Sequence, residues 1–216
     1  MTGPNSRYFL SAGRKLHAVT WGDVAAPPVV LVHGLKDMAR AWDGIATRLA
    51  DDFFVVAPDL AGHGDSPWSA DRAYTMSSYV YDLASLVRDL ERDGHTGPVL
   101  LVGHSLGGNI ALRYAAAEPE RVSRLCAIEG IGPTPDKAAE TDAQPVEERM
   151  RAWMDKRRTL LERTPRAIMT SAWRPCCSHV PTHILRQHGP ITWPSTRRVA
   201  RTMARSFGST IHWSQR

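Results

Sequence analysis

The sequence predicts an α/β fold with a mostly parallel sheet, and three observations support this prediction. Short apolar runs alternate with stretches of helical periodicity over the first 130 residues, which is typical of parallel strands joined by helices. An apolar fraction of 43% and a charged fraction of 23% are typical of a globular protein with a packed core. No apolar run reaches the roughly 18 residues of a membrane-spanning helix, so we expect no transmembrane segment.

The strands are predicted from two kinds of pattern. Residues 7–11 and 14–21 alternate between apolar and polar side chains, and Gly13 between them indicates a hairpin turn. Continuous apolar runs, which are typical of strands buried on both faces, cover residues 27–34, 53–59, 98–102 and 124–130. Between these runs, apolar residues at helical spacing predict helices over residues 38–50, 76–94, 105–117 and 145–164.

The cysteines and the first residues of the sequence indicate the cellular compartment in which the protein is expected. Of the three cysteines, Cys176 and Cys177 are adjacent, and the set forms neither a disulfide framework nor a zinc-binding pattern. The first residues contain no charged region followed by a long apolar region, so we expect no signal peptide. We therefore expect a cytoplasmic protein. The sequence implies no metal and no organic cofactor.

The chemistry-bearing stretch of the sequence runs from Gly103 to Gly107 and matches the motif G-x-S-x-G between a predicted strand and a predicted helix. Such a turn holds the serine in a strained backbone conformation, and its glycines avoid clashes with neighbouring backbone. Ser105 is therefore our candidate nucleophile. The N–H of Leu106, at the start of the helix, is a candidate oxyanion donor. The alternative is a glycine-rich turn that contains a serine by chance.

Two further strand ends carry candidate site residues. His33 and Gly34 follow the run 27–34, where a turn can direct the Leu35 N–H toward the same oxyanion. Taken alone, this is an ordinary turn in which His33 makes structural hydrogen bonds. Asp59 begins the loop D-L-A-G-H-G-D-S after the next strand, and we expect it to hold this loop rather than to catalyse.

The order and spacing of HG, D-x-x-G-H-G-x-S and G-H-S-L-G-G over residues 7–135 resemble the α/β-hydrolase superfamily. The segments HGLKDMARAWD and IEGIGP are similar to its serine-hydrolase-like branch. The resemblance implies the α/β-hydrolase fold and the hydrolysis of a small-molecule ester or similar acyl substrate through an acyl-serine. It also implies a helical cap after the sixth strand. Relatives that cleave epoxides or carbon–halogen bonds carry aspartate where this chain has Ser105, so those reactions are disfavoured.

The resemblance implies an acid and a histidine that follow the serine in the chain. Glu129, at the end of the sixth predicted strand, is the candidate acid, and the alternative is a structural role at the hinge of the cap. No histidine is assigned as the base, although the C-terminal segment contains His179, His183, His188 and His212. His104 is expected to point to the wrong side of the turn, and His63 and His95 lie away from the expected position. We therefore expect this chain to be weakly active or inactive.

The net charge of +5 is unevenly distributed along the chain. All 22 acidic residues lie at or before Glu162, so residues 1–162 carry a net charge of −4, whereas residues 163–216 carry nine arginines and no acid. We accordingly expect a hydrolase core over residues 1–135, a partial cap over 136–164 and an atypical, poorly structured basic tail over 165–216. The last strands of the family sheet are expected to be missing.

Three interpretations of the tail stay open. The first is a change of reading frame between Arg163 and Trp173, because acids and hydrophobic periodicity both stop there. The second is a basic tail that binds nucleic acid or anionic lipid. The third is a non-catalytic, hydrolase-shaped interaction protein. Under the hydrolase interpretation no nucleic-acid partner is expected, and the sequence makes no prediction of oligomeric state.

Overall fold

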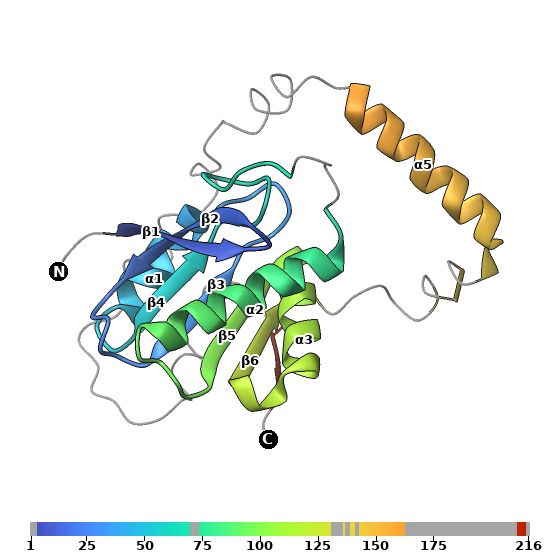
Figure 1. The fold of residues 1–216 in the computed structure, drawn as a ribbon. Coiled ribbons are helices and arrows are strands. Elements are labelled where there is room, and N and C mark those ends of the chain that lie inside the picture. Colours follow the sequence, from blue (N-terminus) through green and yellow to red (C-terminus); the bar gives the residue numbers. More distant parts are fainter. Residues whose placement is uncertain are drawn as a thin grey trace. The chain divides into compact units, whose positions relative to one another are not determined.

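The computed structural model describes residues 4–69, 74–130, 136, 139–140, 143–162 and 211–214. Contacts divide the chain into two compact units, namely Met1–Ile131 together with Pro181–Arg216, and Gly132–Val180. Among the described residues, the first unit contains the sheet and helices α1, α2 and α3, and the second contains helix α5 (Figure 1).

The first unit is built on one mixed sheet whose strands lie in the order β1-β2-β4-β3-β5-β6-β7. The strands are β1 (Asn5–Ser11), β2 (Arg14–Trp21), β3 (Pro28–Val32), β4 (Phe54–Pro58), β5 (Val99–His104), β6 (Val122–Ile128) and β7 (Ile211–Ser214). Strand β3 pairs in parallel with β4 and β5, and β5 pairs in parallel with β6. Among β1–β6, strand β2 alone runs against the others. The predicted mostly parallel sheet is therefore confirmed.

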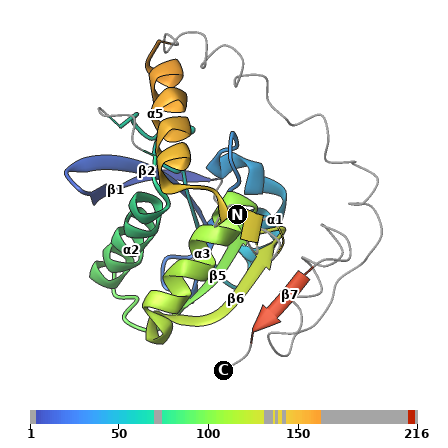
Figure 2. The same cartoon turned by 90° about the vertical axis from the view of Figure 1, so that its right-hand side faces the viewer.

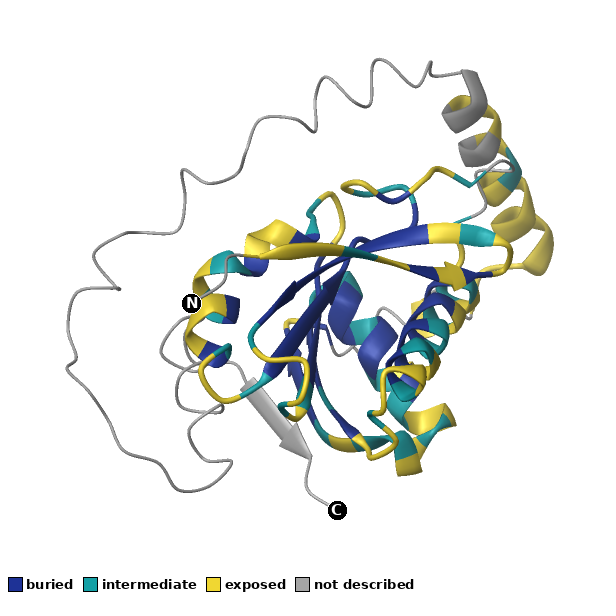
Figure 3. Ribbon diagram, turned by 60° about the vertical axis from the view of Figure 1, so that its left-hand side comes forward, coloured by how far each residue is buried: buried dark blue, intermediate teal, exposed yellow. Residues whose placement is uncertain are grey.

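Helices cover both faces of this sheet, in agreement with the continuous apolar runs of the central strands. Neighbouring residues of a strand point to opposite faces, and Val29 and Val30 are both fully buried, each in a different cluster. Helices α2 (Met76–Arg92) and α3 (Leu106–Ala117) contribute Leu86 and Ile110 to one cluster. The short helix η1 (Ala39–Trp42) and helix α1 (Asp43–Leu49) contribute Trp42 and Leu49 to the other. Figure 3 shows the central strands buried between these two layers.

Strand β6 carries Cys126, whose side chain is buried in the cluster on the α1 face. Burial away from water disfavours the thiolate and raises the pKa of this thiol to about 11.

The hairpin β1–β2 is closed by a tight turn and joined to α2. Ala12 and Gly13 both have positive φ, 47° and 76°, as a two-residue hairpin turn requires. Beside the turn, Ser11 and Arg14 donate hydrogen bonds to the buried carboxylate of Asp82 on α2, and Arg14 does so at 2.7 Å. Burial raises the pKa of Asp82, although both of these hydrogen bonds favour its ionised form.

The strand β7 departs from the predicted tail, in which no strand was expected. It pairs antiparallel with β6, so that Ile211 lies opposite Ile128 and Ser214 opposite Leu125 (Figure 2). Four residues are too few to display a period, and a pairing with a distant edge strand leaves no local signal in the sequence. The predicted frame change between Arg163 and Trp173 lies outside the described residues.

Helix α5 (Val146–Glu162) agrees with the helix predicted over residues 145–164. Pro145 precedes it, and Glu147 and Glu148 occupy its first turn, where acids interact favourably with the helix dipole. The cap role of residues 136–164 stays a prediction. Within the described part of the chain, every helix is too short or too polar to cross a membrane.

The sheet contains a topological switch point between β3 and β5. The chain leaves β3 through α1 on one face toward β4, and it leaves β5 through α3 on the other face toward β6. In open α/β sheets, ligands bind outside the carboxyl ends of two such strands. Because Val32 pairs with Gly103, these ends place His33 and His104 at the same edge.

Candidate active site

Ser105 occupies the turn between β5 and α3, directly at this switch point. Its φ of 50° and ψ of −111° form a strained conformation for a residue that has a side chain. The turn is fixed on both sides, because the Ser105 N–H donates to the Ile128 carbonyl at 2.8 Å and the Ser105 carbonyl accepts the Asn109 N–H at 3.1 Å. Ser105 is half-buried and directly follows the last residue of β5.

The glycines of the motif are required by close backbone packing. A Cβ on Gly103 would lie 2.3 Å from the Gly107 carbonyl oxygen, and a Cβ on Gly107 would lie 2.2 Å from the Val32 carbonyl oxygen. Backbone atoms cannot rotate away as a side chain can, so no larger residue fits without moving a strand. These two glycines therefore allow β3, β5 and α3 to meet around Ser105.

The loop after β3 lies next to this turn. A Cβ on Gly34 would lie 3.5 Å from the Cβ of Ser105 and 3.1 Å from Nδ1 of His104. Leu35, the next residue, has a side chain 62% exposed. Leu106 is the first residue of α3, and the first N–H groups of a helix lack partners within it. The roles of the Leu35 and Leu106 N–H groups as oxyanion donors stay predictions.

His33 is a buried structural residue of this loop. The Leu60 N–H donates to Nε2 at 3.0 Å, so Nδ1 carries the proton and donates to the Gly34 carbonyl at 2.7 Å. Burial is the main reason that the pKa of His33 falls to about 4, although the hydrogen bond to Gly34 acts against it. The neutral ring therefore connects the loop after β3 to the loop after β4.

Asp59 holds the loop after β4, as its position in the sequence predicts. The residue is 3% exposed, and its Oδ1 accepts the Ala39 N–H at 2.7 Å. Its Oδ2 accepts the Asp65 N–H at 3.0 Å and lies 2.7 Å from Nδ1 of His17. Ser66 Oγ donates to the Asp59 carbonyl at 2.6 Å. Asp59 thus joins three segments of the chain through one carboxylate.

Glu129 follows β6 and has a φ of 54°, which is uncommon for a residue with a side chain. Its side chain is 69% exposed, and its Oε2 lies 3.6 Å from Nε2 of His104. That separation is longer than a hydrogen bond. The structure therefore brings Glu129 beside His104, and its role as the catalytic acid stays a prediction.

The remaining histidines leave the general base unassigned. In the described ranges, no histidine ring is hydrogen-bonded to the Ser105 hydroxyl. The His63 ring lies 5.2 Å from the ring of His33, and burial lowers the pKa of His63. The His95 ring stacks on Phe54. His179, His183 and His188 lie outside the described residues, and His212 is described only as part of the β7 backbone.

A family model described as "alpha/beta hydrolase fold" matches residues 27–171, about two thirds of the chain. This chain belongs to the alpha/beta hydrolase fold family. The matched range contains the loops after β3 and β4, the turn at Ser105 and helix α5.

Curated relatives of this hydrolase-family chain include lipases and esterases. The chain is 39% identical to the lipase LipV of Mycobacterium tuberculosis, over 53% of this chain and 41% of that protein. It is 37% identical to the 3-hydroxybutyrate-oligomer hydrolase of Cupriavidus necator, over 52% of this chain and 38% of that protein. The chain thus spans well under half the length of either relative.

Solved structures of the family resemble this chain in fold. A thioesterase domain from the curacin biosynthetic pathway gives a TM-score of 0.54 at 28% identity, over 57% of this chain and 43% of that one. An epoxide hydrolase from Vigna radiata gives a TM-score of 0.53 at 27% identity, over 58% of this chain and 38% of that one. One fold therefore supports different reactions, and the residues of the site must distinguish them.

One group of the described residues could approach a metal ion. Single ligand atoms of His17, Asp59 and Asp65 lie within 4.8 Å of one another. However, both carboxylate oxygens of Asp59 already accept backbone N–H groups, and His17 occupies the same Oδ2. A cation would have to displace these bonds, so this donor set fits the protein's own hydrogen bonding better than a metal.

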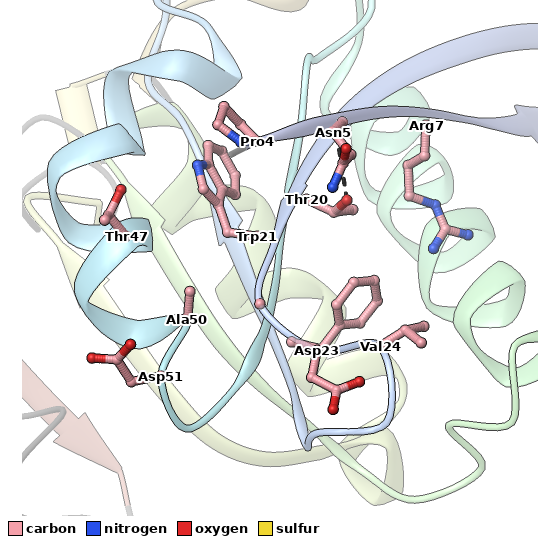
Figure 4. A pocket seen from close by; sticks show the side chains of 12 residues that line it. Pro4, Asn5, Arg7, Thr20, Trp21, Asp23, Val24, Thr47, Ala50 and Asp51 are labelled. Atoms are coloured by element: carbon pink, nitrogen blue, oxygen red, sulfur yellow. Dashed lines mark hydrogen bonds between the residues drawn. The ribbon is translucent and has the colours of Figure 1, made fainter. Parts of the chain in front are cut away.

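A cavity of about 830 Å³ is shown in Figure 4. It lies at the end of the parallel strands opposite to Ser105. Asn5 at the start of β1, Trp21 at the end of β2, Phe54 at the start of β4 and Thr47 on α1 line it. Since β4 and β5 run in the same direction, a cavity at the start of β4 is remote from the end of β5. We do not assign this cavity to the chemistry of Ser105.

Sequence analysis missed His17, which lies in the middle of β2. The residue is 2% exposed, and its contact with Asp59 depends on a loop from another part of the chain. The available signal was a histidine within the strand-like run R-K-L-H-A-V-T-W, because a buried polar side chain needs a partner.

Proposed function

We propose that this chain is a serine hydrolase that cleaves an ester or similar acyl bond through an acyl-serine on Ser105. The observation that supports this is the strained turn at Ser105, with strand before it, helix after it and glycines packed against backbone on either side. Serine at this position also favours an acyl-serine route over the aspartate-dependent cleavage of epoxides.

In the proposed reaction, the Ser105 hydroxyl attacks the acyl carbon while a base takes its proton. The developing oxyanion accepts hydrogen bonds from the N–H groups of Leu35 and Leu106. Glu129 is the proposed acid that orients the base. The bond between the acyl carbon and the leaving oxygen breaks, and the leaving alcohol takes the proton from the base. Water then attacks the acyl-serine, which releases the acid product and restores the hydroxyl.

The base has no assigned residue, and we propose that turnover by this chain is correspondingly slow. Loss of a triad member leaves residual catalysis from the oxyanion hole and from substrate binding. The residues 136–164 are proposed as part of a cap that covers the substrate.

The test is labelling with a serine-reactive fluorophosphonate, followed by tryptic mapping. Ser105 lies in the peptide Asp93–Arg113, and labelling of this peptide is expected in the unaltered chain and lost in Ser105→Ala. The matched control is Ser77→Ala, which removes an exposed serine on α2 and should leave that label unchanged. No label on this peptide in the folded chain would refute an activated Ser105 and favour a non-catalytic, hydrolase-shaped interaction protein.

A further inference from the structure

A second serine of this chain has a histidine and a carboxylate in line behind it. Ser6 Oγ on β1 lies 3.0 Å from Nε2 of His17 on β2, and Nδ1 of His17 lies 2.7 Å from Oδ2 of Asp59. Both separations are hydrogen bonds. The order hydroxyl, imidazole, carboxylate is the arrangement by which a base activates a nucleophile and an acid orients the base.

The hydrogen bonds around Asp59 determine how the imidazole is oriented. The carboxylate accepts N–H groups from Ala39 and Asp65, so it faces His17 as a further acceptor. His17 Nδ1 therefore carries a proton and donates it to Oδ2. The Nε2 lone pair is then directed at Ser6, whose O–H donates to it. This is the tautomer that a general base requires.

The three residues of this arrangement differ in their exposure to solvent. His17 and Asp59 are 2% and 3% exposed, whereas Ser6 is exposed on β1, the edge strand of the sheet. Ser6 is therefore open to solvent, while the histidine and the carboxylate behind it are buried in the fold.

The surface beside Ser6 has an aromatic and cationic character. Tyr8 is half-exposed, and its ring lies 5.2 Å from the ring of His17. The ammonium of Lys15 lies 4.5 Å from the centre of the Tyr8 ring. An aromatic group can stack on Tyr8, and a phenolate that forms as a leaving group would be stabilised by the Lys15 charge.

We propose that Ser6 is a second nucleophile of this chain, activated by His17 and Asp59, and that it accepts acyl groups from aryl esters. The Ser6 proton moves to Nε2 of His17 while Oγ bonds to the acyl carbon. The bond between that carbon and the aryl oxygen breaks, and the phenolate takes the proton from His17. The products are an acyl-serine at position 6 and a phenol, so atoms and charge balance.

This proposal is independent of Ser105, and its test keeps the two serines apart. Ser6 lies in the tryptic peptide that ends at Arg7, whereas Ser105 lies in Asp93–Arg113. The Ser105→Ala chain is treated with p-nitrophenyl acetate and, separately, with a fluorophosphonate, and mass spectrometry locates each modification. We expect Ser6 to be modified at least about 100-fold faster than the exposed Ser77, which matches a typical gain from a general base. The Ser6→Ala/Ser105→Ala chain should lose this modification.

A variant of the base distinguishes activation from accessibility. In the Ser105→Ala background, His17→Gln keeps a polar side chain but removes the base, and Ser6 should react at least about 100-fold more slowly. Circular dichroism checks that each variant is folded, and if His17→Gln is not, the comparison of Ser6 with Ser77 decides alone. Modification of Ser6 no faster than Ser77, or at an unchanged rate in folded His17→Gln, would overturn the proposal. Neither result would bear on the label expected on Asp93–Arg113 in the unaltered chain.

Discussion

Ser105 and Ser6 lie in two regions of the molecule that contrast in backbone conformation and in hydrogen bonding. Ser105 sits in a strained turn at the switch point of the sheet, directly before helix α3, and none of the described histidines is hydrogen-bonded to its hydroxyl. Ser6 lies on a regular edge strand, and its hydroxyl is bonded to a histidine that a carboxylate fixes. The comparison shows that presentation of a nucleophile and its deprotonation are separate structural problems.

The largest expected effect concerns the carboxylate behind Ser6. Asp59→Ala would leave two buried donors, the Ala39 N–H and the His17 ring, and the N–H of the exposed Asp65 without an acceptor. We expect the free energy of unfolding to fall by about 4 kcal/mol in urea denaturation, as for other broken buried ionic networks. The exposed Asp52→Ala is the control and should change it by less than about 0.5 kcal/mol. A loss below about 1 kcal/mol for Asp59→Ala would mean that this carboxylate does not hold the loop.

The turn at Ser105 predicts the next largest effect. Gly107→Ala forces a Cβ against the Val32 carbonyl, and we expect a loss of about 3 kcal/mol in the free energy of unfolding. Gly44→Ala on α1 is the matched control, because a Cβ there meets no atom within 4 Å and alanine favours helix by about 1 kcal/mol. Equal stability of the two variants would contradict the packing described around Ser105.

His33, in the loop after β3, should make the stability of the protein depend on pH. Its pKa is about 4 when folded and near the ordinary value of 6.5 when unfolded, so the unfolded chain binds more protons between these values. Stability should therefore fall as the pH falls, by about 2 kcal/mol from pH 7 to pH 5. Urea denaturation at each pH measures this fall. In His33→Gln, whose side chain does not titrate, the fall in stability from pH 7 to pH 5 should be smaller by that amount. An unchanged fall would show that His33 is not buried as a neutral ring.

The smallest effect is expected at Ser6 itself. Ser6 is an exposed residue, so Ser6→Ala should change the free energy of unfolding by less than about 0.5 kcal/mol. Thermal unfolding beside the Ser77→Ala control is sufficient to measure this. A loss above about 1.5 kcal/mol would mean that Ser6 serves mainly to satisfy the buried ring of His17, and it would weaken the contrast with Ser105.

Local patterns in the sequence predicted most of the sheet. Buried strands such as β3 and β4 give continuous apolar runs, and the glycines around Ser105 are required by contacts within a few residues of the turn and with β3. The contact between His17 and Asp59 was not predicted, because it joins β2 to a loop that only the folded sheet brings near. The four-residue strand β7 escaped prediction for the same reason, since its partner is β6.

The partners of Glu129 could not be predicted from its place after a strand. Its left-handed backbone turns the side chain toward His104, and a sequence pattern carries no information on such an angle. The proposed roles of Ser105, Leu35, Leu106 and Glu129 come from their positions after strands β3, β5 and β6.

The buried thiol of Cys126 on β6 can be used to detect opening of the core by chemical modification. With its pKa raised to about 11 and its side chain covered by the α1 layer, this cysteine resists alkylation at neutral pH while β6 stays paired. Each alkylation event at Cys126, resolved by peptide mass, therefore records an opening of the core that exposes this side chain of β6. Where reclosing is faster than alkylation, the rate of that reaction gives the fraction of time that this part of the core is open, without any added denaturant.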